Sequence, residues 1–352
     1  MNTNVEETSP RYLYEKKLAA NLVEAKKESY RIAWEERILP QILSGKLFKP
    51  EQLESIQKNY EENLLKLSSP LDLPYNVELL RIEAELYDIL DLPPFKAFRR
   101  VFHQKVADIF VGYYPIDDVN ALVTCTAPNN YLILVNEGVM RAVYYLSILM
   151  LSATRISDEE PKEEISDPAY IRSKLSTHFK EFLENGRFPG ERELFLNPEK
   201  MQLVNRISHF AYAFVVAHEF AHIIHSDFSV ATPHHFMLGE TTLEIFDKMK
   251  DEELQADLLA FQWLQYSGAT DSISMQAEQL SEFVYCGIWL FYKAAVLLEK
   301  LYQFRPDTHP SAADREAFLR KNGWERYEEG LGLAGKFEVT WKACFDGVFE
   351  DL

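Results

Sequence analysis

The spacing of apolar residues along the chain predicts a protein built mainly of helices. Between residues 11 and 69, Leu, Ile and Tyr recur every three or four positions among Lys and Glu, which is typical of amphipathic helices. The later helices that we expect are more continuously apolar. Their predicted ranges are 76–90, 93–110, 138–151, 199–225, 250–267 and 275–303.

Two short runs of strand-forming residues interrupt the helical pattern. Residues 119–124 and 131–135 are rich in Val, Leu and Ile, and the turn-forming sequence TAPNN at 126–130 separates them. We therefore predict a hairpin within an α+β fold that is mostly α-helical. The acidic segment 154–168 and the Asn-, Gly- and Pro-containing segment 185–198 are predicted loops.

A boundary is predicted near residues 68–70, where the sequence reads Ser-Ser-Pro. Residues 1–75 are expected to form an N-terminal helical extension. Residues 76–352 are expected to form the main domain, which is long enough to bury a substantial core.

The charge balance argues against two classes of partner. The 352 residues include 55 Asp and Glu against 37 Lys and Arg, a formal net charge of −18. Binding to nucleic acid or to an anionic membrane surface needs clustered basic residues, so we expect neither. The three cysteines are far apart in the sequence, which disfavours both a disulfide framework and a cysteine zinc site.

Localisation and membrane topology are predicted from the apolar segments. The first residues lack the apolar core of a secretory signal. The most apolar segment, 283–298, is shorter than a membrane span and contains Lys293, which favours a buried helix. We therefore expect a cytoplasmic protein without integral membrane insertion. The sequence does not indicate its oligomeric state.

One predicted helix carries the strongest chemical signal. Residues 201–225 are apolar on most sides, which favours a central helix, yet they include His218, Glu219 and His222. The two histidines are four residues apart, so both imidazoles project from one face and can reach one Zn²⁺ at about 2.0–2.1 Å. Glu219 lies where its carboxylate can contact water rather than the metal. The alternative is two core histidines, which would need hydrogen-bond partners inside an apolar turn.

A catalytic zinc site needs a third protein ligand and one open position. Glu253 and Asp257 lie four residues apart on the next predicted helix. Glu253 can supply the ligand, and Asp257 can accept the free N–H of a ligand histidine. An acidic helix start explains Asp251 and Glu252, but it explains Asp257, among Ala, Leu and Phe, poorly. His225 shares part of the metal face, but Glu253 is the better candidate.

These motifs resemble those of a known peptidase family. HEFAH at 218–222 followed by ELQAD at 253–257 is similar to the gluzincins, specifically the CAAX-prenyl-protease and heat-shock-membrane-protease family with its soluble relatives. Residues 119–138 are similar to a hairpin of that family whose edge strand lines the cleft, and residues 308–315 (THPSAADR) are similar to a late family segment. The four segments occur in the family's order, and the resemblance covers about residues 76–320.

The resemblance implies a zincin-like catalytic core and a role for each matching residue. The edge strand, assigned here to 131–135, would bind an extended peptide by strand addition. His309 and Arg315 would lie near the cleft, one of them stabilising the oxyanion, although His309 before Pro310 is equally well explained as a helix-start residue. The resemblance implies that His218, His222 and Glu253 are the zinc ligands. It implies that Glu219 is the general base and that Asp257 orients His218.

The sequence departs from the family pattern in three ways, and the first two affect the details of the cleft. The hairpin turn is longer and has Asn129-Asn130 where Gly-Gly is usual, and Glu316 follows Arg315 where an aliphatic residue is usual. The family's membrane helices are missing, which indicates a soluble relative. His234 and His235 are predicted to lie in a loop between the two metal helices.

The sequence therefore predicts a zinc-dependent endopeptidase that acts on protein or peptide substrates. The alternative is a catalytically silent or latent zinc-stabilised regulatory or binding protein. Glu219 favours the enzyme because a structural zinc site does not need such a carboxylate. A latent enzyme would have its cleft covered by the N-terminal helices or by the 154–168 loop. The sequence does not reveal the substrate.

Overall fold

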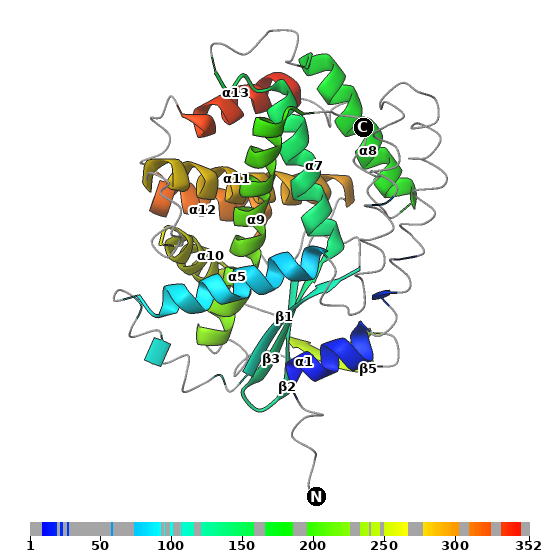
Figure 1. Cartoon of the computed structure of the whole chain (residues 1–352), viewed down its shortest axis with the longest axis vertical. Coiled ribbons are helices and arrows are strands. Elements are labelled where there is room, and N and C mark those ends of the chain that lie inside the picture. The colour runs from blue at the N-terminus through cyan, green and yellow to red at the C-terminus, as the bar shows by residue number, and fades with distance from the viewer. Residues whose placement is uncertain are drawn as a thin grey trace, which may run out of the picture.

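The structure is a computed structural model of the chain. Helices and strands carry the same labels as in Figure 1, in which η2, β4 and η9 are not marked. The structure describes residues 9–19, 22, 23, 27, 58, 74–92, 95, 99, 100, 106, 108–115, 121–157, 166–185, 196–225, 233–238, 241–246, 250–266, 277–302, 310–324 and 332–345. The elements are α1 (Pro10–Leu13), η2 (Tyr14–Leu18), α5 (Pro74–Leu90), β1 (Asp108–Tyr114), β2 (Ala121–Ala127), β3 (Asn130–Asn136), α7 (Glu137–Ala153), α8 (Pro168–Asn185), α9 (Pro198–His225), β4 (Pro233–Leu238), β5 (Thr241–Phe246), α10 (Lys250–Leu264), α11 (Ala277–Tyr302), α12 (Ala312–Leu319), η9 (Arg320–Trp324) and α13 (Leu333–Phe345).

Helix α9 forms the centre of the molecule, as its apolar sequence predicts. Helices α5, α7, α10 and α11 all pack against it, and every residue from Ile207 to Ile224 is buried (Figure 1). Large side chains such as Phe214, Phe220 and Trp289 fill the spaces between these helices. Burial of such apolar surface is the dominant favourable contribution to folding, so the polar residues of α9 are held in a rigid environment.

A three-stranded mixed sheet lies at one end of the helical core. The strand order is β1-β3-β2, with β1 parallel to β3 and β2 antiparallel to β3. The turn between β2 and β3 has Asn129 at a φ of 66°, a left-handed conformation that Asn tolerates better than most residues. Alternate residues of each strand point to opposite faces, and one face, including Val111 and Ile133, joins the main core.

Residues 10–18 cover the other face of this sheet. Tyr14 is fully buried against Phe110 and packs directly over Gly112 of β1. Its hydroxyl donates to the Tyr113 carbonyl at 2.7 Å and accepts from the Asn76 amide at 2.7 Å. The described N-terminal residues are therefore packed into the fold of the following segment.

Several predicted elements agree with the structure and others were wrong. The helices predicted over 76–90, 138–151, 199–225, 250–267 and 275–303 are confirmed within a few residues at each end. The helix predicted over 93–110 was wrong at its end, since residues 108–110 begin β1. Tertiary pairing with β3, more than 20 residues later, decides this segment.

Two predictions about the strands also need correction. Residues 131–135 were predicted to form the edge strand, but they belong to β3, which is hydrogen-bonded to β1 on one side and to β2 on the other. Their backbone groups are therefore already paired. His234 and His235 were predicted to lie in a loop, but they belong to β4, which pairs with β5.

Two helices are long and apolar enough to meet a compositional criterion for a membrane span. They are α9 and residues 280–300 of α11, and their most apolar windows are 100% and 67% buried in the fold. A buried core helix meets the same criterion, which describes α9 well. The expected lack of membrane insertion stays a prediction.

Candidate metal centre

The C-terminal turns of α9 carry the first part of the site. His218 and His222 lie one helical turn apart, and their side chains are almost completely buried, as is that of Glu219 between them. Buried imidazoles and carboxylates are unfavourable unless each is paired. The surrounding residues therefore have to supply polar partners for this turn.

The first turns of α10 supply two of these partners. Glu253 and Asp257 are buried and lie one turn apart on the face that packs against α9. Asp251 is exposed in the same first turn, where an acidic side chain interacts favourably with the helix dipole. The two buried carboxylates, Glu253 and Asp257, instead face the histidines. An acidic helix start therefore explains Asp251 but not these two residues.

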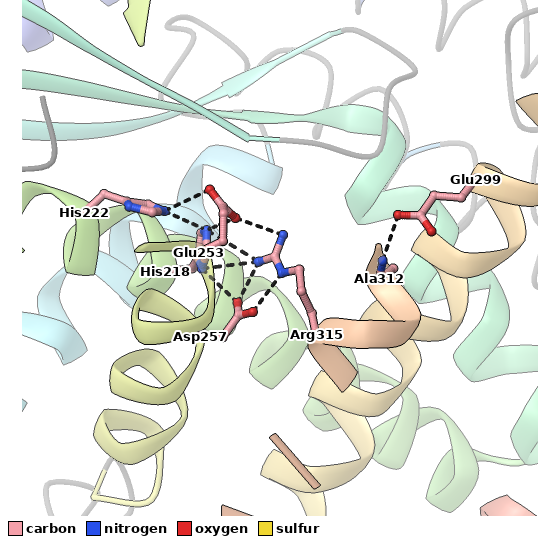
Figure 2. Close-up of polar contacts among 7 residues, drawn as sticks. All are labelled: His218, His222, Glu253, Asp257, Glu299, Ala312 and Arg315. Atoms are coloured by element: carbon pink, nitrogen blue, oxygen red, sulfur yellow. Dashed lines mark hydrogen bonds and ion pairs between the residues drawn. The ribbon is translucent and has the colours of Figure 1, made fainter. Parts of the chain in front are cut away.

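Three potential ligand atoms converge on one point. Each of His218, His222 and Glu253 offers an atom within 4.8 Å of the other two. The two Nε2 atoms are 3.0 Å apart, Oε2 of Glu253 lies 3.3 Å from Nε2 of His218, and Oε1 of Glu253 lies 3.4 Å from Nε2 of His222 (Figure 2). Ligands of a tetrahedral Zn²⁺ at about 2.0–2.1 Å lie about 3.3–3.4 Å from one another. The donor set and its spacing therefore fit a zinc ion.

Asp257 fixes the orientation of the His218 ring. Its Oδ1 lies 2.9 Å from Nδ1 of His218. A carboxylate accepts only, so this contact assigns the imidazole proton to Nδ1 and leaves the lone pair of Nε2 directed at the convergence point. Burial alone would lower the pKa of His218, but Glu253 and Asp257 together raise it.

Arg315, a residue of α12, contacts both the Glu253 and the Asp257 carboxylate of α10. Its Nε and Nη2 donate to the two oxygens of Asp257 at 2.7 and 2.6 Å, and Nη1 lies 3.1 Å from Oε2 of Glu253. Burial opposes ionisation of both acids, but Arg315 and His218 hold the pKa of Glu253 well below its usual range and also lower that of Asp257. Both groups are therefore anionic at neutral pH, as metal ligation and ring orientation require.

His225, which was also weighed as a ligand, is exposed at the end of α9. His309 lies outside the described residues. The sequence did not identify Tyr292 of α11, which is fully buried with its ring 5.7 Å from Cζ of Arg315, and whose pKa is raised by burial and by Asp257. A Tyr on an apolar helix gave no signal of this contact.

Residues 149–323 match the model of a family described as Peptidase U49. The match supports a proteolytic function. It spans both metal-site helices and Arg315. No curated protein and no solved structure matches the chain.

Proposed function

We propose that the protein is a zinc-dependent endopeptidase of the gluzincin type. The observation that carries this proposal is the convergence of His218, His222 and Glu253 on one buried point, within 4.8 Å of one another. The order His-Glu-x-x-His followed by Glu-x-x-x-Asp supports the same reaction class. The peptidase match over residues 149–323 supports the proteolytic part of the proposal.

The residues of the site divide the work of peptide hydrolysis. His218, His222 and Glu253 would hold a Zn²⁺ ion, which would supply the Lewis acidity that peptide hydrolysis needs and lower the pKa of water toward about 7. Glu219, on the same turn as the histidines, takes a proton from the attacking water and delivers it to the leaving amine. Asp257 and Arg315 hold the ligands in place. The contacts of Arg315 favour this positioning role over direct oxyanion stabilisation.

Two variants test the proposal separately for metal binding and for turnover. We expect stoichiometric zinc by elemental analysis in the wild-type protein and its loss in His222→Ala. Glu219→Gln should keep the zinc but lower kcat by at least about a hundredfold, because it removes the general base. Hydrolysis is measured by mass spectrometry of a digested peptide library, with the Asp251→Asn variant as a control for the loss of an acidic side chain.

Each outcome has a definite meaning. Full activity of Glu219→Gln would show that the assignment of this residue is wrong. Zinc in the wild-type protein with no hydrolysis of any peptide would favour the alternative, a silent or latent zinc-stabilised regulatory or binding protein. Absence of zinc in the wild-type protein would overturn the metal site itself.

A further inference from the structure

Helix α12 holds Arg315 against the metal centre although it has only eight residues. So short a helix has little stability of its own and depends on tertiary contacts. Its buried residues are Ala312, Glu316 and Leu319. Glu316 is the charged residue among them. The position of Arg315 therefore depends on what surrounds Glu316.

Two basic side chains surround Glu316. Nζ of Lys293, from α11, lies 3.0 and 2.8 Å from its two oxygens, and Arg320 donates to Oε1 from Nε at 3.1 Å and from Nη2 at 3.0 Å. The Lys293 ammonium also lies over the rings of Trp289 and Trp341, at 5.2 and 5.8 Å from their centroids. Such a paired, largely buried carboxylate is costly to unpair, so this contact fixes α12 firmly.

Several contacts join α12 to α11. Arg315 lies over the ring of Tyr292, and Glu316 pairs with Lys293. Further along, Oε1 of Glu299 accepts from the backbone N–H of Ala312 at 2.8 Å, at the start of α12 (Figure 2). Neighbouring residues of a helix point about 100° apart, so α12 can direct Arg315 to α10 while Glu316 faces α11.

We infer that Lys293, Glu316 and Glu299 are positioning residues, which lock the register of α12 on α11 and thereby hold Arg315 on Glu253 and Asp257. A slip of α12 by one turn would move its side chains by about 5.4 Å and withdraw the guanidinium from both carboxylates. The metal ligand Glu253 and the ring-orienting Asp257 would then lose a shared partner. This inference rests on the proposed function for its effect on catalysis.

The test combines structure, metal affinity and kinetics in Glu316→Gln and Lys293→Met. In crystal structures of the variants we expect Arg315 to leave Asp257 and Glu253. We expect the dissociation constant for Zn²⁺, measured by competition with a chelator, to rise about tenfold, the low end for residues that support metal ligands. On a cleaved peptide, kcat should fall with little change in KM.

Two further variants separate positioning from stability. Lys293→Arg keeps a positive charge that can pair with both oxygens of Glu316, so its zinc affinity and kcat should be closer to those of wild type than the values of Lys293→Met. Tyr14→Phe removes a buried hydrogen bond far from α12 in the fold, so it should lower the melting temperature while leaving zinc affinity and kcat unchanged. A purely structural role for Glu316 would instead make Glu316→Gln behave like Tyr14→Phe.

The failure of this inference can be distinguished from failure of the proposed function. If Arg315 keeps its contacts with Asp257 and Glu253 in both variants, the inference is wrong, whatever the enzyme does. Unchanged zinc affinity after those contacts are lost would also overturn it. If the wild-type protein binds no zinc, the proposed function fails, and the crystal structures still decide whether Lys293 and Glu316 position Arg315. If Glu316→Gln does not fold, Lys293→Met serves for every measurement.

Discussion

Asp257 is the residue whose contacts connect the two halves of the site. It orients His218 and accepts two hydrogen bonds from Arg315. We predict that Asp257→Asn lowers zinc affinity about 10- to 100-fold, because the uncharged amide holds the His218 ring less firmly in the ligating tautomer. Asp251→Asn makes the same chemical change on an exposed residue of the same helix. Chelator competition should give that control the wild-type affinity, and equal affinities for both variants would contradict the prediction.

Single-residue roles could be predicted from sequence where spacing along one helix determines them. His218 with His222, and Glu253 with Asp257, are each four residues apart, and helical geometry alone places each pair on one face. The contact of Arg315 with Asp257 joins residues 58 positions apart, so no local sequence pattern could predict it. The pairing of Lys293 with Glu316 could not be predicted from a local pattern either. The place of Lys293 in an apolar helix indicated only that some partner was needed.

The packing of α5 on α9 includes a histidine between two carboxylates. Nδ1 of His209 lies 2.6 Å from Glu78, and Nε2 lies 3.0 Å from Glu85, with Arg81 beside Nδ1 at 3.3 Å. Only an imidazolium can donate from both nitrogens. Burial alone would lower the pKa of His209, but the hydrogen bonds to Glu78 and Glu85 raise it above its ordinary value.

The sign of the resulting pH dependence follows from that raised pKa. A group with a higher pKa in the folded state stabilises the fold fully below its unfolded pKa of about 6.5. That stabilisation is lost as the pH rises through the folded pKa. We predict that His209→Gln costs about 1–3 kcal/mol at pH 6, as expected for hydrogen bonds to charged groups. In urea unfolding from pH 6 to pH 9 the difference from wild type should shrink, and a constant difference would contradict the prediction.

At the scale of elements, the sequence predicts what depends on local periodicity. The limits of α9 and α10 follow from their apolar spacing and lie within three residues of the predicted ranges. The central position of β3 could not be predicted in the same way. It depends on β1, which precedes the hairpin and pairs with β3 in parallel, and such non-local pairing leaves no periodic pattern in the sequence.

At the scale of the whole molecule, the contact between Tyr14 and Gly112 attaches the N-terminal helical turns to the sheet. A Cβ atom added to Gly112 would lie 2.5 Å from the Tyr14 ring, which is fully buried. We predict that Gly112→Ala destabilises the protein by about 1–3 kcal/mol, the usual range for overpacking. In a Tyr14→Ala background the same substitution should cost almost nothing, because the clash is gone. Denaturant unfolding of the four proteins measures this coupling, and additive effects would contradict it.

The same contact has a consequence for synthesis on the ribosome. The Tyr14 hydroxyl bonds to a carbonyl 99 residues later in the chain. At about 5–20 residues per second, the nascent chain carries Tyr14 for about 5–20 s before its docking strand is even translated. During this interval Leu13, Tyr14 and Leu18 have no sheet to pack against. These three side chains thus have to wait for partners that are translated later, and a nascent-chain chaperone that shields them would act at this stage.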